Sequence, residues 1–598
     1  MKNTINYFSF IDNLNKALSP INKAALPLSI LRVLAVVTLQ NHADENIAFN
    51  FDKATQDEWE AYCNTLESKE SPYFNAFGLD TLGLLSQYSV QAIRNTVGEL
   101  HGMENSGLLG ESQTKYFINA VLEHSKLDIN TDNPFVDIGL YELSNELLAK
   151  FGVAETYISW DVSNQATALL NAESKFVESP TPNSYLALIS VILGKIDYRF
   201  TDSVFKPTYM ENLKLQKFQG GFSIVPFGYR SKFSAEDDVF NRFDFYTNYY
   251  HPMLIQHLLQ QVTNVVMVIV PESVLFSQVS SEVTLKEWLI KNRYLRNIVS
   301  LPGRTFSNTA IATSLLILDP RAQNSFVHMC KLENSTFIEM DKRSVRLINT
   351  VELAELLFQQ QENAFSKNVS YEDIHQNAYT LSVNRYINDG VYGKYQNKLT
   401  NTITKKFNAV FEIQRPIAFA KLKQQGSEKI YELQAGDMPE VGYLNVASKE
   451  VLTTSQVLDE NAASFLREND LVLMVRGVIG KVGLVSKEIL DKYEGRITVN
   501  QSGLILRLKD ATISPIAALM ALRSELGQAT FQYNANTASA AISILALADL
   551  KNLPIPYPAD EQELQKAHEL FYQQIRIQEE IVEKQKQLQQ LTKQLWSL

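Results

Sequence analysis

The run NVVMVIVPESVLF, residues 264–276, decides the fold of this chain. Its first half is an apolar stretch rich in β-branched residues, long enough for one strand and far below the roughly 18–20 residues of a membrane span. A proline and two polar residues end this stretch. A continuous apolar run between turn signals is typical of a strand that is buried on both faces of a sheet.

The same pattern recurs through the middle of the chain. FVDIG (135–139) precedes a helical stretch at 140–152, and TYISWD (156–161) precedes another at 163–176. Further strands are expected in GFSIVPF (221–227), LRNIVSLPG (295–303) and ATSLLILD (312–319). This alternation predicts an α/β domain with a mostly parallel sheet covered by helices on both faces. In such sheets ligands bind at the carboxyl ends of the strands.

The segments on either side have different patterns. Residues 1–130 carry apolar residues at three- and four-residue spacing, which predicts a helical domain. From about residue 410, β-branched runs punctuated by glycine predict a compact α+β module. We therefore expect four parts: a helical domain at 1–130, an α/β domain at 131–400, the module at 401–559 and a helix at 560–598.

The terminal helix is expected to carry an apolar stripe. Spacings of three, four and seven residues place five side chains on one face, namely Ile577, Ile581, Leu588, Leu591 and Leu595. Such a stripe must be buried somewhere. Two coverings are open: a second copy of the chain, or folding back onto the same chain.

Composition restricts the class of protein. With 598 residues, 45% hydrophobic and 20% charged, the chain has ordinary globular composition and needs several domains. Its formal charge of −11 argues against nonspecific coating of nucleic acid, although a local basic patch can still bind DNA. Only Cys63 and Cys330 are present, and the start lacks the apolar core of a signal peptide. We expect a cytoplasmic protein with neither disulfides nor a metal site.

Acidic residues follow the predicted strands. Asp137 follows the first strand, Asp161 the second and Asp202 a third, before the stretch GGFSIVPFGYR at 220–230. A cofactor with a ribose or an adenine needs acidic acceptors at strand ends and a glycine-rich turn beside them. Gly139 stands alone after Asp137. From the residues alone, helix capping in an ordinary α/β sheet is favoured over cofactor binding as the role of these acids.

Longer stretches resemble a known family. VVMVIVPESVLFSQ (265–278) and LIKNRYLRNIVSLPGRTFSNTAIATSLLILD (289–319) resemble the adenine-specific DNA methyltransferase domain of type I restriction–modification modification subunits. This resemblance covers residues 130–330, and the helical first 130 residues suit the family's N-terminal domain. It implies a Rossmann-like methyltransferase fold.

The module from about 410 to 560 resembles one target-recognition domain of a type I specificity subunit. The resemblance rests on LQAGDMPEVGYLNV (433–446), VNQSGLILRL (499–508) and ASAAISILALADLKNLPIPYP (538–558). The terminal helix is similar to the spacer helix of that subunit. The resemblance implies a modification subunit fused to half of a specificity subunit.

In the methyltransferase family, S-adenosylmethionine lies against a strand that ends in Asp-Pro-x-x-Gly-x-Gly, where side chains would obstruct the cofactor. The resemblance aligns this turn with residues 137–142, where Leu140, Tyr141 and Glu142 are large. It implies that Asp137 and Gly139, with Asp161 near the ribose and Asp202 near the adenine, are a vestigial cofactor site. We expect no cofactor, and S-adenosylmethionine only if the enzyme is active.

The catalytic loop of the family reads Asn-Pro-Pro-Phe or Asn-Pro-Pro-Tyr. Its asparagine and first proline carbonyl accept hydrogen bonds from the adenine amino group, and its aromatic ring stacks on the flipped base. The aligned residues are Ile224, Val225, Pro226 and Phe227. Phe227 keeps the stacking ring, but Ile224 cannot accept a hydrogen bond, a loss typically worth about two to three orders of magnitude in rate. The resemblance thus implies an inactive methyltransferase fold, and an active enzyme with divergent motifs is the alternative.

In the second module, VRGVIGK at 475–481 is a candidate DNA-facing loop. Arg476 and Lys481 supply charge, and Gly477 and Gly480 allow close approach of the backbone; a solvated structural hairpin is the alternative. Asn500 is a further candidate for DNA contact, with pairing inside the module as the alternative.

The tract DFYTNYYHP at 244–252 lies where the family approaches flipped DNA, although packing explains most of its rings. His251 within it has no metal partners in the sequence pattern.

These features predict a DNA-binding protein of a prokaryotic restriction–modification or anti-phage defence system that recognises duplex DNA. No nuclease cluster or helicase P-loop is visible in the sequence. Because one module reads one half-site, we expect a homodimer or a complex with a nuclease, helicase or other effector subunit. A protein-interaction scaffold without DNA affinity is the third hypothesis.

Overall fold

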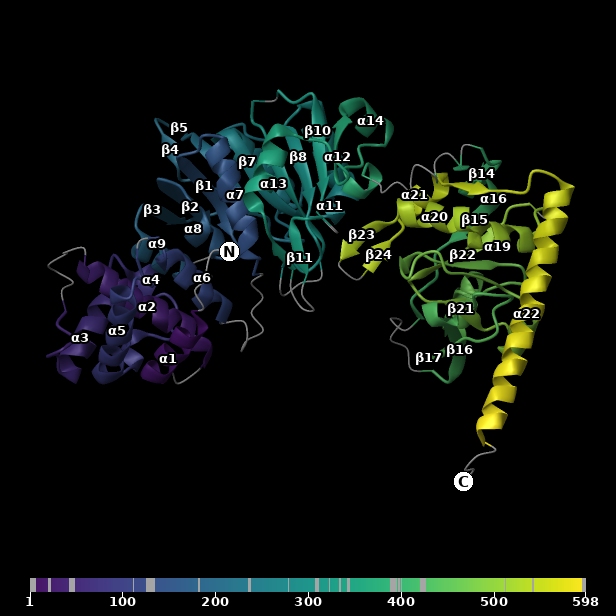
Figure 1. Cartoon of the computed structure of the whole chain (residues 1–598), viewed down its shortest axis with the longest axis horizontal. Coiled ribbons are helices and arrows are strands. Elements are labelled where there is room, and N and C mark those ends of the chain that lie inside the picture. Colours follow the sequence, from purple (N-terminus) through teal and green to yellow (C-terminus); the bar gives the residue numbers. More distant parts are fainter. Residues whose placement is uncertain are drawn as a thin grey trace. The chain divides into compact units, whose positions relative to one another are not determined.

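The computed structural model (Figure 1) describes residues 7–19, 23–41, 49–110, 112–124, 135–180, 183–234, 238–277, 279–306, 311–321, 323–332, 335–340, 345–387, 395, 398–399, 401–419, 426–510, 512–539 and 542–593. The chain forms two compact units, Met1–Val383 and Asn384–Leu598. The expected boundaries near residues 130 and 400 lie outside the described residues, and the four-part division stays a prediction. Among the described residues, no helix is both long and apolar enough to cross a membrane.

The first unit begins with helices that share one apolar core. They are α1 (Phe8–Leu18), α2 (Leu26–Asn41), α3 (Gln56–Glu67), α4 (Phe74–Phe77), α5 (Val90–Asn105) and α6 (Thr114–His124). Helix α2 is buried from Leu26 to Val37 and packs against α9 (Ser184–Leu193) of the following α/β region. Because the same core continues from Tyr7 to Leu357, the helical segment is packed into the α/β region.

A nine-stranded sheet forms the centre of this unit, in the order β13-β10-β8-β9-β7-β6-β1-β2-β3. Its strands are β1 (Glu155–Asp161), β2 (Ser174–Ser179), β3 (Ile196–Phe200), β6 (Phe218–Ile224), β7 (Val262–Pro271), β8 (Leu295–Ser300), β9 (Thr313–Leu318), β10 (Phe326–Lys331) and β13 (Ser366–Ser370). From β3 to β7 all neighbours are parallel, whereas β9 is antiparallel to β7 and β8. The expected α/β fold with a mostly parallel sheet is confirmed.

Strand β7 contains the apolar run VVMVIV and lies in the middle of the sheet. All six residues of Val265–Val270 are fully buried, because the sheet is covered on both faces. The remaining elements of the unit are α7 (Ile138–Lys150), α8 (Gln165–Leu169), α10 (Tyr250–Gln261), α11 (Ser273–Phe276), α12 (Ser280–Lys291), α13 (Thr350–Gln359), α14 (Tyr371–Gln376), and the short strands β4 (Met210–Glu211), β5 (Lys214–Leu215), β11 (Ile338–Met340) and β12 (Val345–Leu347). Figure 1 shows α7 and α13 side by side, and they pack against each other.

Two local predictions were wrong. FVDIG is no strand of the sheet: Val136 forms only an isolated bridge with Phe306, and α7 begins at Ile138 because Asp137 caps it. The expected helix at 163–176 ends at Leu169, and strand β2 follows. Strand β2 escaped the sequence pattern because polar residues, Lys175 and Glu178, are among those it buries.

The second unit is α+β, as expected. A four-stranded antiparallel sheet has the order β15-β22-β18-β20, and a three-stranded sheet has the order β17-β16-β21. Their bounds are β15 (Phe411–Gln414), β16 (Glu428–Leu433), β17 (Lys449–Thr453), β18 (Leu471–Met474), β20 (Val482–Leu484), β21 (Ile497–Val499) and β22 (Gly503–Leu508). Successive residues of β18 enter two different apolar cores, because strand side chains alternate between the two faces of a sheet.

Shorter elements complete this unit. The strands are β14 (Thr404–Lys406), β19 (Arg476–Gly477), β23 (Asn536–Ser539), β24 (Ile542–Ile544) and β25 (Pro554–Pro556). The helices are α16 (Phe407–Val410), α17 (Ser455–Glu460), α18 (Lys487–Lys492), α19 (Pro515–Arg523), α20 (Glu525–Asn534), α21 (Leu547–Asn552) and the long α22 (Glu561–Lys593).

Candidate functional site

The order of the strands reverses between β1 and β6. Strands β2 and β3 follow β1 on one side, while β6 and β7 lie on the other. In open α/β sheets, ligands bind at the carboxyl ends of the strands beside such a reversal. In the register of these strands Asp161 is paired with Ile224, and Ile224 is paired with Ile269. The candidate site therefore lies where β1, β6 and β7 end.

Asp137 and Gly139, which the sequence placed at the end of a sheet strand, join α7 to β12 instead. The Oδ1 atom of Asp137 accepts hydrogen bonds from the backbone N–H groups of Gly139 (3.0 Å) and Leu347 (2.9 Å). A Cβ on Gly139 would lie 2.4 Å from the carbonyl oxygen of Leu347. Glycine is therefore required here by the close approach of two elements of the same unit. The turn beside the strand reversal is the one after Asp161.

The buried cap at Asp137 predicts a pH dependence of stability. Burial raises the pKa of Asp137 to about 6, against the opposing effect of the hydrogen bonds from Leu347 and Gly139. Because this pKa is higher in the folded state, stability is greatest below the unfolded pKa of about 4 and falls as the pH rises to about 6. Asp137→Asn keeps both accepted hydrogen bonds, and we expect it to raise the stability at pH 8 by about 1–2 kcal/mol.

Scanning calorimetry at pH 4 and pH 8 measures this effect. The asparagine variant should unfold at a higher temperature than the wild type at pH 8 and at nearly the same temperature at pH 4. Asp137→Ala is the matched control, because loss of the cap should lower stability by about 0.5–2 kcal/mol at either pH. An asparagine variant that is less stable than the wild type at pH 8 would show that the charge of Asp137 stabilises the fold.

The carboxylate of Asp161, at the end of β1, is bonded to its own chain. One oxygen accepts hydrogen bonds from the backbone N–H (2.7 Å) and hydroxyl (2.8 Å) of Thr167, and the other accepts from Ser163 (2.9 Å). The residue is 2% exposed, and burial raises its pKa despite these bonds. The hydroxyl groups of Tyr141 and Ser163 also lie 2.9 Å apart. Asp161 therefore stabilises the start of α8.

Aromatic side chains gather beside Asp161 and Asp202. Trp160 has a φ of 57°, and its ring packs edge-on against Tyr229 (5.1 Å between centroids) and Tyr250 (4.8 Å). The Tyr250 hydroxyl donates a hydrogen bond to Asp202 Oδ1 at 2.7 Å. A bulky residue with positive φ costs about 1–3 kcal/mol and persists only where its surroundings hold it. The contacts of the Trp160 ring supply that support.

These residues do not fit S-adenosylmethionine in the way that the family binds it. The turn after β1 reads Val162-Ser163-Asn164 and contains no glycine, so side chains stand where the backbone would approach the cofactor. The carboxylate of Asp161 is already bonded, and Asp202 is bonded to Tyr250. The hydrogen bonds of Asp161 and Asp202, and the absence of glycine at 162–164, thus differ from the glycine-rich turn that the family offers to the cofactor.

The tetrapeptide Ile224–Phe227 begins at the last residue of β6. Ile224 is fully buried in the apolar core, and the backbone N–H of Val225 donates to the carbonyl of Ile269 at 3.2 Å. Phe227 is half-buried, with its ring centroid 5.8 Å from that of Phe306. The structure therefore brings the stacking candidate to the site, while the side chain of Ile224 faces the core.

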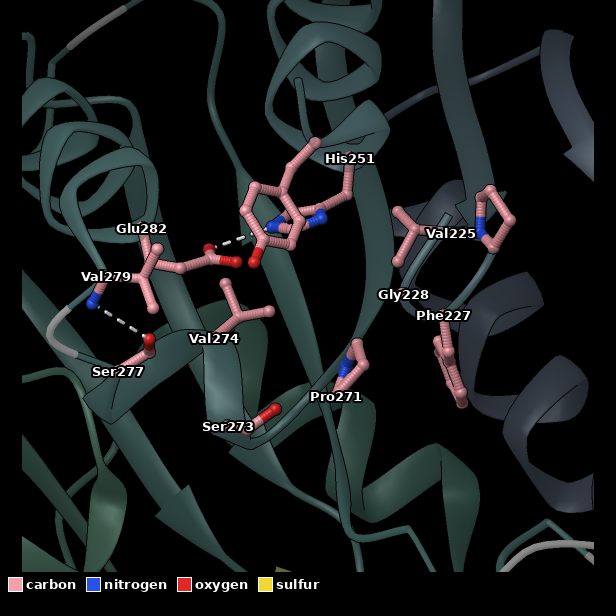
Figure 2. A pocket seen from close by; sticks show the side chains of 12 residues that line it. Val225, Phe227, Gly228, His251, Pro271, Ser273, Val274, Ser277, Val279 and Glu282 are labelled. Carbon is pink, nitrogen blue, oxygen red and sulfur yellow. Dashed lines mark hydrogen bonds and ion pairs between the residues drawn. The ribbon is translucent and has the colours of Figure 1, made fainter. Parts of the chain in front are cut away.

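A cavity of about 200 Å³ lies at the carboxyl ends of β6 and β7 (Figure 2). Residues 225–228 line one side of it, and residues of α10, α11 and α12 line the other. On that second side His251 Nε2 and Glu282 Oε2 lie 2.8 Å apart, with their side chains only 5% and 8% exposed. The sequence singled out His251 but missed Glu282, because the two residues lie on separate helices and no spacing signal links them.

A chain of buried hydrogen bonds holds the loop that follows Asp202. Arg242 donates to the Ser203 carbonyl (2.9 Å) and to His257 Nδ1 (3.0 Å). His257 Nε2 lies 2.9 Å from the Tyr157 hydroxyl, which in turn donates to Glu178 Oε2 at 2.5 Å. Burial, helped by the charge of Arg242, lowers the pKa of His257 well below its usual range. The ring is therefore neutral and carries its proton on Nε2. The sequence analysis singled out none of the residues in this chain of hydrogen bonds.

In the second unit, the candidate DNA loop connects the antiparallel strands β18 and β20 and contains β19, which pairs with β24. Arg476 and Gly477 are exposed, and Gly477 has a φ of 77°. Gly480 is buried and has a φ of 86°. A Cβ at this position would lie 2.7 Å from Gln528 Oε1. Lys481 is half-buried and donates from Nζ to the Ala435 carbonyl at 3.4 Å. Of the two basic candidates, Arg476 presents its charge to solvent.

The side chain of Asn500 is bonded within the second unit. Its Oδ1 atom accepts from the Ser502 N–H at 2.9 Å, and its Nδ2 atom donates to Gln434 Oε1 at 2.7 Å. These bonds support the structural role over direct DNA contact.

Helix α22 folds back onto its own unit at one end and is exposed along the rest. Phe571 is fully buried in the core of the unit, and Ile575 packs against that core. Beyond them the apolar stripe is open, with Ile577 48%, Ile581 44% and Leu588 63% exposed. Leu595, the last expected member of the stripe, lies outside the described residues.

Comparison with known proteins identifies both halves of the chain. The model of the N-6 DNA methylase family matches residues 177–392, and that of the type I restriction modification DNA specificity domain matches residues 404–596. The chain joins an N-6 DNA methylase domain to a type I DNA specificity domain. The expected recognition is therefore confirmed. The methylase match begins in β2 and includes the Ile224–Phe227 loop, but leaves out the turn after β1.

Individual relatives are distant. The type I restriction enzyme MpnII methylase subunit of Mycoplasma pneumoniae is 27% identical over 110 residues, which is 18% of this chain and 20% of that protein. The chain thus spans about a fifth of the length of this curated relative.

Two solved structures are also similar to the methylase–specificity chain. A type I restriction–modification methyltransferase subunit from Streptococcus thermophilus matches with a TM-score of 0.48 and 14% identity, covering 64% of this chain and 98% of that one. The type IIG restriction endonuclease BpuSI matches with a TM-score of 0.43 and 12% identity, covering 94% of this chain and 75% of that one.

Proposed function

We propose that this chain recognises duplex DNA for a type I restriction–modification system, and that its methylase domain does not transfer methyl groups. In this proposal the specificity domain reads one half-site, and the methylase domain is a scaffold that engages the DNA beside it. The two family matches support the presence of a methylase domain and a specificity domain in one chain.

The residues at the end of β1 support the proposal that the methylase domain does not transfer methyl groups. Asp161 is bonded to Thr167 and Ser163, and Trp160 fills the neighbouring space with its ring. On the neighbouring strand, Ile224 is paired with Asp161. It stands where the family's catalytic loop has its hydrogen-bonding asparagine, and it is buried in the core. Loss of one preorganised acceptor alone costs about 10²–10³ in rate. Combined with an obstructed cofactor turn, that loss supports an inactive domain.

An active adenine methyltransferase is the second candidate. It is favoured by the match of the methylase family over residues 177–392 and by Pro226-Phe227, which keep the second half of the catalytic loop in place at the end of β6. In that case S-adenosylmethionine is the cofactor, and the turn after Asp161 must open to admit it.

Two measurements on the full chain separate the candidates. Under the main proposal, calorimetric titration with S-adenosylmethionine gives no heat of binding at micromolar concentrations, and a tritiated methyl group is not transferred to genomic DNA. Gel shifts with duplex DNA give binding that weakens steeply with salt, because phosphate contacts release counterions. Micromolar binding with methyl transfer establishes the active enzyme, and absence of any DNA binding at low salt establishes a protein scaffold.

The exposed stripe of α22 predicts a dimer. Beyond Ile575, helix α22 exposes the apolar side chains of Ile577, Ile581 and Leu588 to solvent. In addition, a single specificity domain is expected to read only one half-site of the DNA. We propose that a second copy covers the stripe in a helix pair. Ile581→Lys with Leu588→Lys should convert the dimer to a monomer in analytical ultracentrifugation. Lys586→Ala, a change on the opposite face of the helix, should leave the dimer intact. A wild-type chain that is monomeric at micromolar concentration would exclude this pairing.

A further inference from the structure

A β-hairpin of the first unit ends in an exposed leucine. Strands β4 and β5 are antiparallel and are joined by two residues, Asn212 and Leu213. Leu213 is 89% exposed, and Met210 on β4 is 45% exposed. These two large apolar residues therefore contribute little to the packing of their own unit.

The backbone of this turn is unfavourable for a leucine. Asn212 has a φ of 51° and Leu213 a φ of 60°, the positive values that a type I′ turn requires at both positions. Asparagine and glycine suit such a turn, whereas a bulky side chain brings its Cβ close to the following carbonyl oxygen. A strained residue that is not held by packing points to a function outside the fold.

The base of the hairpin is fixed to the sheet. The N–H of Gln216 donates to the carbonyl of Tyr209 at 3.1 Å, and the hydroxyl of Tyr209 donates to the Asp197 carbonyl at 2.5 Å. The ring of Tyr209 is fully buried and packs edge-on against Phe176 and Phe218. A contact site that is held in place before binding loses less entropy when a partner docks.

The hairpin lies at the opposite end of the sheet from the candidate site (Figure 1). It leads directly into β6, and the side chain of Gln261, the residue before β7, donates to the Tyr209 carbonyl at 3.2 Å. The candidate site lies where β6 and β7 end. The seven residues of β6, about 23 Å long, thus separate the hairpin from a ligand of that site.

The charges beside the turn favour an acidic partner. In residues 206–217, all of which the structure describes, the exposed charged side chains are Lys206, Lys214, Lys217 and Glu211. This stretch is therefore positive on a chain whose formal charge is −11. Complementary charges orient a partner as it docks, whereas a large apolar side chain at the centre of a contact needs a pocket from which water is excluded.

We propose that the β4–β5 hairpin is a docking site for another protein, which receives Leu213 in an apolar pocket bordered by carboxylate side chains. Leu213 is the anchor of this contact, and Lys214 and Lys217 are placed to meet the carboxylates. The apolar tip favours a protein over a nucleic acid, because phosphates would be met by the lysines alone. The inference goes beyond the proposed function and does not depend on it.

Photo-cross-linking from the tip of the hairpin tests this proposal. The photoreactive residue p-benzoylphenylalanine replaces Leu213 in the full-length chain, which is expressed in its native host. We expect an adduct with one other protein, whose cross-linked peptide carries apolar residues flanked by aspartate or glutamate. Charge reversal by Lys214→Glu with Lys217→Glu should lower the yield of this adduct by about 10-fold or more. The same probe at Lys69, an exposed residue of the same unit, is the control and should not give this adduct.

A glycine variant separates docking from folding. Leu213→Gly removes both the anchor and the strain, so the midpoint of thermal unfolding of the free chain should rise by about 1–2 °C. Its affinity for the purified cross-linked protein should fall by about 10–100-fold, as expected for the loss of a central apolar anchor. Asn212→Gly is the matched control, because it suits the same turn and keeps Leu213, and its affinity should equal that of the wild type.

Four results would overturn the proposal. An adduct with duplex DNA would make the hairpin a nucleic-acid contact, and an adduct with a second copy of this chain would make it a site of self-association. A yield at position 213 that does not exceed the yield at position 69 would mean that nothing docks there. An unchanged affinity of the Leu213→Gly variant would mean that the tip is not the anchor. None of these results bears on DNA recognition, which the gel shifts measure separately.

Discussion

Replacing Arg242 with leucine is expected to destabilise the first unit by about 3–5 kcal/mol. Arg242 and Asp238 form an ion pair at 2.8 Å with side chains that are 1% and 0% exposed. The same guanidinium donates to the carbonyls of Ser203 and Val204 and to His257. Its loss leaves the buried carboxylate of Asp238 without a counter-charge and several buried acceptors without this donor. Breaking a buried pair in this way costs more than replacing both of its members.

Urea unfolding followed by tryptophan fluorescence measures this effect, since Trp59, Trp160 and Trp288 all belong to the first unit. The matched control is the double variant Arg242→Leu with Asp238→Asn. Its amide keeps an oxygen for the backbone N–H of Phe240 but carries no charge, so part of the stability should return. If the double variant is as unstable as the single one, the unpaired charge is not the cause.

Restoring Asn-Pro at positions 224 and 225 is the second change with a large expected effect. Ile224 is fully buried, so an asparagine there places an amide in the apolar core. Val225→Pro removes the N–H that donates to Ile269. We expect Ile224→Asn with Val225→Pro to lower the stability by about 3–5 kcal/mol and to produce no methyl transfer. The turn after Asp161 would still obstruct the cofactor.

The matched control for this pair is Ile224→Val, which keeps the position apolar and should cost only about 0.5–1.5 kcal/mol. Transfer of a tritiated methyl group to DNA is measured with both variants at a temperature where each is folded. Methyl transfer by the Asn-Pro variant would contradict the proposal, because it would mean that the end of β1 admits S-adenosylmethionine as it stands.

The parts of the fold that the sequence predicted are those whose cause is local. The apolar runs of β6, β7, β8 and β9 are buried on both faces, so their composition alone identifies them as strands. Strand β2 was missed because two of the residues that it buries are charged. Lys175 donates to backbone carbonyls at 167 and 170, and Glu178 accepts from Thr208, which lies 30 residues further along the chain. FVDIG resembles a strand in sequence because an aspartate after apolar residues can either cap a helix or follow a strand. In the structure Asp137 caps α7.

The candidate site was predictable only where a motif is contiguous. Residues 224–227 follow one strand, so their place at its end could be read from the chain itself. Glu282 and Arg242 act through partners that depend on how helices and loops meet. The relation between Asp161 and Ile224 follows from strand order, because β1 and β6 are neighbours although β2 and β3 intervene in sequence.

The core shared by α2 and α9 has a consequence for how the protein is made. Helix α2 leaves the ribosome long before α9, which packs against it and begins only at Ser184. The strands that flank α9 in sequence, β2 and β3, join the sheet through β1, and β1 in turn pairs with β6, which is made later still. Contacts between such distant segments form slowly, and apolar surface is exposed in the meantime. The buried side chains of α2 that contact α9 therefore stay exposed until residues 184–193 have been synthesised. A fragment that starts at the methylase strands would expose α9 and aggregate, whereas one that ends at Val383 retains the whole core of the first unit.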